Sequence, residues 1–183
     1  MVQSYGSLPD VPLAVKAEAR NQSVQLLNQV LADSMVLFTL YKKHHWLMRG
    51  HTFSQLHLLL DRHAEEQLSL IDLLAERVQT LGAIAISDPW HVAEVSKIPR
   101  PPRGAEEVSE MLARMVEAHA VVIGEVSSAV QTTASNLDWA TNDLLVGDVL
   151  RSNEKQVWTL NEHVMDAPVI WASGSHPSGR AGV

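Results

Sequence analysis

The stretch Ser54–Leu81, SQLHLLLDRHAEEQLSLIDLLAERVQTL, decides the fold of this chain. Leucine or isoleucine recurs at positions 56, 60, 68, 71 and 74, and this spacing predicts one long amphipathic helix. Ser54 suits the N-cap and Gly82 suits the end of such a helix. Asp72 and Glu76 lie one turn apart on it, so both carboxylates project from the same face.

Similar spacing elsewhere predicts three more long helices and a short one. The long helices are expected from Asn21 to Leu47, from after Gly104 to about Thr133, and from Trp139 to Met165. Ser87-Asp88-Pro89 begins a short helix, Trp90 to Lys97, that ends before Pro99. This order predicts an all-α, ferritin-like four-helix bundle with a short extra helix between helices two and three. The expected division is an N-terminal arm (1–20), the bundle (21–166) and a C-terminal tail (167–183).

Composition limits the classes of protein that fit. The 183 residues suit one domain, and only two Phe and two Tyr leave a mainly aliphatic core. A formal net charge of −7 disfavours non-specific binding to DNA. The absence of cysteine excludes disulfides, thiolate zinc sites and thiol nucleophiles. We expect neither a secretory signal nor a membrane span, and therefore a cytoplasmic protein.

Histidines upstream of the carboxylate pair form a second polar cluster, which contains His45 and His57. Imidazole together with carboxylate is the ligand mix expected for iron or zinc, rather than for calcium or magnesium. His57 and Asp72 are fifteen residues apart, or roughly 22 Å along one helix. No single metal ion can therefore touch both His57 and Glu76 of the same helix.

The turn around Gly50 offers a different arrangement. His45 closes the first long helix, and this turn would fold it back beside His57. The two histidines would then meet at one end of the second helix, with Asp72 and Glu76 at the other end. A two-fold axis that lays two copies antiparallel would bring the histidines of one chain to the carboxylates of its partner. The site would be shared between subunits and would occur twice per dimer.

Several of these segments resemble the signature of the Dps proteins, or mini-ferritins. The resemblance is carried by His45-Trp46-Leu47-Met48-Arg49-Gly50, Phe53, Leu56-His57 and Ile71-Asp72-Leu73-Leu74-Ala75-Glu76-Arg77. Residues 88–99 resemble the short middle helix of this family, and Glu154–Leu160 resemble its final-helix pattern. The resemblance covers about residues 21 to 166.

This resemblance implies a ferroxidase: a hollow homo-dodecamer that binds Fe(II), oxidises it with hydrogen peroxide or dioxygen, stores ferric mineral and so protects against oxidative stress. By position, His45 and His57 match the family's histidine ligands, and Asp72 and Glu76 match its carboxylate ligands across a two-fold interface. The remaining matches are Asp61, at an acidic position near a second, weaker iron, and Trp46, beside the site, where it would carry electrons or scavenge radicals.

The chain departs from the Dps pattern in two respects. Extra histidines surround the matched pair, at His44, His51 and His63, with His163 late in the last helix. They resemble the histidine-modified centres of some cyanobacterial Dps-like proteins, and could favour zinc or change the preferred oxidant. The terminal segments are not lysine-rich, so DNA binding is not expected.

Other readings stay open. A ferritin with its di-iron site inside each bundle would use Glu-x-x-His motifs, and this chain has none. A non-catalytic zinc-binding or DNA-compacting helical shell protein is the principal alternative. Two further expectations concern the last long helix: its acids Asp138, Asp143 and Asp148 could line a three-fold pore, and Trp158 is expected in the core.

Overall fold

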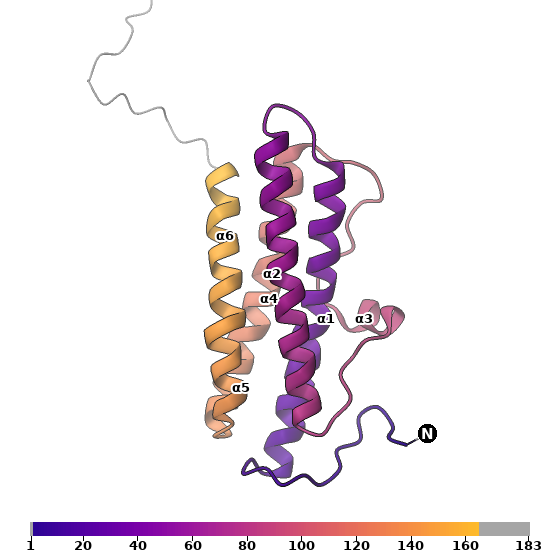
Figure 1. Ribbon diagram of the computed structural model, residues 1–183, viewed down its shortest axis with the longest axis vertical. Helices are drawn as coiled ribbons and strands as arrows, with labels where there is room; N and C mark the ends of the chain where they lie inside the picture. The colour runs from indigo at the N-terminus through magenta and orange to yellow at the C-terminus, as the bar shows by residue number, and fades with distance from the viewer. Residues whose placement is uncertain (1, 165–183) are drawn as a thin grey trace, which may run out of the picture.

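Four long helical segments lie alongside one another in the computed structural model, which describes residues 2–164 (Figure 1). The first three long helices are α1 (Ala17–Leu47), α2 (Phe53–Thr80) and α4 (Val108–Ser135). The fourth segment consists of α5 (Trp139–Leu144), the π-helical turn η1 (Leu145–Leu150) and α6 (Arg151–Val164). The short α3 (Pro89–Val95) lies in the connection between α2 and α4, beside α1. The prediction of an all-α four-helix bundle with a short helix in this connection is confirmed.

The α1–α2 hairpin is the part of the fold that positions the candidate ligands. The two helices run antiparallel and are joined by a five-residue turn, 48–52. Gly50 has a φ of +91°, in the left-handed region where a side chain is strained. By length and composition α1 could cross a membrane, but 61% of its most apolar window is buried inside the bundle. There it packs against α2 and α4, as the core helix of a bundle does.

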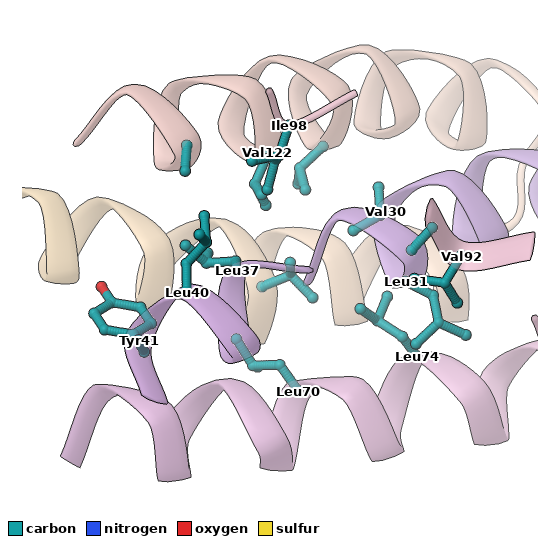
Figure 2. Close-up of a cluster of buried hydrophobic side chains, with 14 of the residues drawn as sticks. Val30, Leu31, Leu37, Leu40, Tyr41, Leu70, Leu74, Val92, Ile98 and Val122 are labelled. Atoms are coloured by element: carbon teal, nitrogen blue, oxygen red, sulfur yellow. The ribbon is translucent and has the colours of Figure 1, made fainter. Parts of the chain in front are cut away.

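The core is aliphatic, as the composition predicts. Figure 2 shows leucine and valine side chains from α1, α2 and α4, with residues of α3 and the following loop, filling the space between the helices. Leu31, Leu37 and Leu74 are fully buried there. Tyr41 lies at one end of this cluster and marks the start of a polar layer inside the bundle.

The N-terminal segment is held against one end of the bundle. Arg20 is 3% exposed, and its guanidinium donates to the carbonyl oxygens of Pro9 at 3.3 Å and Leu81 at 3.2 Å. Gln3 donates to the carbonyl of Gly82 at 2.9 Å. Helix α1 begins at Ala17, earlier than expected, because 17–19 are helix-favouring residues with an acid in the first turn. The tail predicted from residue 167 lies outside the described residues.

A π-helical turn interrupts the fourth segment, which the sequence predicts as one continuous helix. The amide of Asn153 donates to the carbonyl of Val149 at 2.7 Å, so a side chain satisfies a carbonyl of the wider turn. The turn changes the register of α6 relative to α5, because a π-helix advances by one more residue per hydrogen-bonded ring than an α-helix.

Candidate metal centre

His45 and His57 meet at the turn end of the α1–α2 hairpin. Their rings stack with centroids 3.7 Å apart. The Nδ1 of His45 lies 2.8 Å from the carbonyl oxygen of His57, and the Nδ1 of His57 lies 3.0 Å from that of His45. A carbonyl oxygen can only accept, so each Nδ1 carries the hydrogen. The Nε2 of each neutral ring is then left with its lone pair, which is how metal-binding imidazoles are held.

The surrounding residues fix this pair. His45 lies in the last turn of α1 and His57 in the second turn of α2. Phe53 stacks on His57 with ring centroids 4.9 Å apart. Trp46 follows His45 but turns outward and is 72% exposed. The pair is therefore flanked by one aromatic ring that packs on it and one that the fold leaves at the surface.

Asp61 lies one turn beyond His57, close to the pair. Its carboxylate is 3.8 Å from the Nε2 of His45. Lys42 also binds this carboxylate, at 2.5 Å, and its hydrogen bond holds the pKa of Asp61 below the usual range. Asp61 thus lies within reach of a metal at His45, but it already has a cationic partner.

Asp72 and Glu76 lie on α2 far from the histidines. Both side chains are exposed, and within residues 2–164 neither forms a side-chain hydrogen bond or ion pair. Fifteen residues of helix separate His57 from Asp72, or roughly 22 Å. Among the described residues, no group of three or more metal-ligating side chains comes together. One chain therefore presents two candidate half-sites and no complete centre.

The other histidines near this sequence region do not join the pair. His44 is buried, and neither ring nitrogen has a hydrogen-bond partner among the described residues; burial lowers its pKa to about 4. His63 is buried inside the bundle, while His51 and His163 are exposed. The extra histidines thus do not enlarge the half-site within one protomer.

A polar layer inside the bundle was missed by the sequence analysis. Its central hydrogen bonds join Tyr41 to the Nε2 of His119 at 2.5 Å and the Nδ1 of His119 to the Oδ1 of Asn153 at 2.9 Å. Gln67 donates to Asn153 at 3.1 Å and to Gln156 at 2.9 Å. Both nitrogens of His119 are occupied, so the layer does not offer that imidazole to a metal. The sequence did contain a sign of this layer, because His119 lies one turn after Met115 on the apolar face of α4.

The expectation that Trp158 lies in the core is wrong, and the expected pore loses one of its three acids. Asp138 is fully buried and caps α5, with its carboxylate 2.8 Å from Arg77 and 2.7 Å from the hydroxyl of Ser23. Asp143 and Asp148 are exposed, and their place in a three-fold pore between subunits stays a prediction. Trp158 is 61% exposed, and its indole donates to Glu162 on the surface of α6.

The bundle, with a short helix in its middle connection, has the architecture of the ferritin-like class. The sequence profile of the ferritin-like domain matches residues 24–169. The chain belongs to the ferritin-like family and, within it, to the Dps proteins.

Relatives support this assignment. The structure of DpsC from Streptomyces coelicolor is 53% identical, with a TM-score of 0.91 over 93% of this chain and 99% of that one. An archaeal Dps homologue from Halobacterium salinarum is 26% identical, with a TM-score of 0.87 over 93% of this chain and 95% of that one. An uncharacterised protein of the bpoA2 5′ region in Kitasatospora aureofaciens is 50% identical over 73% of this chain and 89% of its own length.

Proposed function

We propose that this protein is a ferroxidase and iron-storage protein that oxidises Fe(II) with hydrogen peroxide or dioxygen at centres shared between subunits of a dodecameric shell. The observation that carries the proposal is the reciprocal pair of Nδ1–carbonyl contacts between His45 and His57, which leaves the Nε2 of each stacked ring for a metal ion. The carboxylates of Asp72 and Glu76, exposed on the same helix, would complete the centre from a second chain. Membership of the ferritin-like family supports this assignment.

The geometry of α2 supports a shared centre. At 100° per residue, His57, Leu68, Asp72 and Glu76 fall within an arc of about 100° on one face of the helix. A two-fold axis that crosses this face about midway, near residues 65–67, would superpose His57 of one chain on the acidic end of its antiparallel partner. The site is then complete only in the dimer.

Apolar surface along the same hairpin supports a contact between two copies. Leu68 is 53% exposed although it lies midway along α2. Beside it, a groove of about 440 Å³ is lined mainly by apolar residues of α1, α2 and α3, including Met35, Phe38, Ile71 and Val92. Exposed apolar surface of this kind is expected where a partner packs.

The donor set suits the oxidation of ferrous iron. Neutral imidazoles bind Fe(II), and hard carboxylate oxygens stabilise Fe(III) relative to Fe(II). Two ferrous ions held together would each give one electron to hydrogen peroxide, which with two protons becomes two waters. Paired transfer avoids the one-electron reduction that releases hydroxyl radical. The ferric product would then be stored inside the shell.

DNA binding is not part of this proposal. The formal charge is −7 per chain, and a shell of many copies would repel the phosphate backbone. Some relatives carry the name DNA protection during starvation protein, but the charge of this chain favours protection through iron chemistry. A gel shift at physiological salt should therefore show no retarded DNA.

The test is Fe(II) oxidation by metal-free protein that is loaded anaerobically and then given peroxide or dioxygen. We expect ferric absorbance to appear quickly, with two Fe(II) consumed per peroxide, as the electron balance requires. The His45→Ala/His57→Ala variant is the matched control, because it keeps the carboxylates and the fold. Oxidation no faster than in buffer would reject the proposal and favour the zinc-binding alternative, which metal analysis of protein purified without added metal would identify.

A further inference from the structure

Tyr41 is a buried residue of the helix that carries His45. It lies on α1 one helical turn before His45, a rise of about 6 Å along the axis, and its side chain is fully buried. Its hydroxyl is 2.5 Å from the Nε2 of His119 on α4. The chain contains only two tyrosines, and Tyr41 is the one that the fold encloses.

The position of the phenolic hydrogen follows from the contacts of His119. The amide nitrogen of Asn153 donates to the carbonyl of Val149 at 2.7 Å, so its Oδ1 faces the Nδ1 of His119 at 2.9 Å. That oxygen can only accept, which places the imidazole hydrogen on Nδ1. The Nε2 of neutral His119 is therefore an acceptor, and the hydroxyl of Tyr41 donates to it.

His63 completes the environment of the phenol. Its Nδ1 is 3.2 Å from the Tyr41 oxygen, and its Nε2 is 3.2 Å from the hydroxyl of Thr159. Thr159 donates its hydroxyl hydrogen to the carbonyl of Gln156 at 2.9 Å, so its oxygen accepts from the Nε2 of His63, and the Nδ1 of His63 carries a lone pair. The Tyr41 hydroxyl therefore faces two imidazole lone pairs and the Oε1 of Gln156 at 3.4 Å, and its one hydrogen goes to the shortest of these contacts, the Nε2 of His119 at 2.5 Å.

We propose that Tyr41 is an internal one-electron donor to the metal centre at His45, and that His119 receives its phenolic proton. The inference rests on the proposed function and deepens it. A phenol that loses an electron must also lose its proton, and here a lone pair already lies at hydrogen-bond distance. The proton moves along an existing hydrogen bond, so no water has to enter the core.

The surroundings of the pair decide when the phenolic proton moves. Burial lowers the pKa of His119 to about 3, so an isolated imidazolium is unfavourable there. Glu66 lies beside the layer, with its carboxylate 2.8 Å from the amide nitrogen of Gln156, and its charge acts on Tyr41 by raising the pKa of the phenol. That charge disfavours a phenolate, so Tyr41 keeps its proton until it loses an electron.

The donor would act when a centre holds a single ferrous ion. Peroxide then takes one electron from Fe(II) and the second from Tyr41, and two protons from solvent complete its conversion to two waters. The O–O bond is cleaved, Fe(II) becomes Fe(III), the phenol becomes a neutral tyrosyl radical and its proton resides on the Nε2 of His119. No hydroxyl radical leaves the protein. Trp46, which is 72% exposed, lacks such an enclosed proton acceptor.

The test is electron paramagnetic resonance of the full-length assembled protein, loaded with one Fe(II) per centre and frozen within seconds of adding peroxide. We expect a neutral tyrosyl radical in the native protein and in Tyr5→Phe, which removes the other tyrosine. Tyr41→Phe should lose this signal and release several-fold more hydroxyl radical to a spin trap. With two Fe(II) per centre, Tyr5→Phe should oxidise iron like the native protein.

Two further measurements separate a redox role from a structural one. In His119→Gln, an amide side chain preserves hydrogen bonding but cannot take up the proton, so the radical yield should fall several-fold. In the Tyr5→Phe background, incorporation of 3-fluorotyrosine labels Tyr41 alone without removing its hydroxyl, and the radical spectrum should acquire fluorine splitting.

The outcomes distinguish this inference from the proposed function. Ferric absorbance without a tyrosyl signal, or a signal that persists in Tyr41→Phe, overturns the donor and leaves the ferroxidase intact. The absence of any ferric absorbance overturns the ferroxidase and the donor with it.

Discussion

The histidine pair at the hairpin end and the polar layer inside the bundle use the same kind of side chain for opposite purposes. At the hairpin end, His45 and His57 satisfy Nδ1 with backbone carbonyls and leave Nε2 for a ligand. Inside the bundle, His119 has both nitrogens paired with protein groups. The two regions are one turn of α1 apart, because Tyr41 and His45 belong to the same helix.

This difference teaches what a metal centre needs from its fold. An imidazole binds metal where the protein satisfies one nitrogen and leaves the other free. The polar layer around His119 instead contributes to the specificity of the fold, because a buried polar group that lacks a hydrogen-bond partner destabilises the folded state. His45 and His57 do not form a complete metal centre in one chain. The carboxylates that would complete it, Asp72 and Glu76, are at the far end of α2.

The largest effect should come from removing the imidazoles of His45 and His57. The His45→Ala/His57→Ala variant should lower the rate of peroxide-driven Fe(II) oxidation by more than about 100-fold, because loss of ligands exceeds the loss expected for their outer partners. Asp72→Ala/Glu76→Ala should give a loss of the same size although its positions are far from the histidines. Stopped-flow ferric absorbance measures both. A variant that keeps near-native rates would remove its residues from the centre.

Removing a hydrogen-bonding side chain from the polar layer around His119 should lower the stability of the protein. Asn153→Ala leaves buried donors on His119 and Gln67 without their acceptor, at about 1–3 kcal/mol each, so the free energy of unfolding should fall by about 2–6 kcal/mol. Denaturant unfolding of the assembled protein measures the change. The matched control is Gln79→Ala on the exposed face of α2, expected within about 0.5 kcal/mol of native. Equal stabilities of both variants would mean that the layer contributes little.

Acid should destabilise the protein through its buried histidines. Burial lowers the pKa values of His44 and His63 to about 4 and of His119 to about 3. Between about pH 6.5 and pH 4 the unfolded chain therefore binds more protons, and the free energy of unfolding falls as pH falls, by up to about 1.4 kcal/mol per pH unit for each histidine. His119→Gln should flatten this slope when unfolding is followed at several pH values. Exposed His163→Gln should leave it unchanged; the same slope in both variants would contradict the assignment.

The smallest effect concerns Lys42, the cation that binds Asp61 beside His45 and His57. Lys42→Met removes the hydrogen bond that lowers the pKa of Asp61 and frees the carboxylate for a metal. Affinity for Fe(II) or Co(II), measured anaerobically by calorimetry, should rise by no more than about tenfold, because an exposed ion pair is only weakly stabilising. Lys97→Met, whose partner is Glu125, serves as the control. Weaker binding in Lys42→Met would show that the lysine supports the site.

The bundle and the meeting of His45 with His57 could be predicted from sequence because both depend on local periodicity and one glycine turn. The layer around His119 could not be assembled in this way, since its members come from four segments and meet only through tertiary packing. Trp158 was wrongly predicted to lie in the core because tryptophan is a large apolar residue. It follows buried Gln156 by two residues, so its side chain is turned about 200° around the axis of α6 from that of Gln156. Asp138 was misread because its role as the N-cap of α5 was not considered.

The central claim is that each centre takes its histidines from one chain and its carboxylates from another. Subunits of His45→Ala/His57→Ala and Asp72→Ala/Glu76→Ala should be mixed, dissociated and re-assembled, with each variant re-assembled alone as the control. In a mixed dimer one of the two centres keeps all four ligands, so the mixture should recover a substantial part of the native Fe(II) oxidation rate. Activity in re-assembled mixtures that never exceeds that of either variant alone would contradict the shared centre.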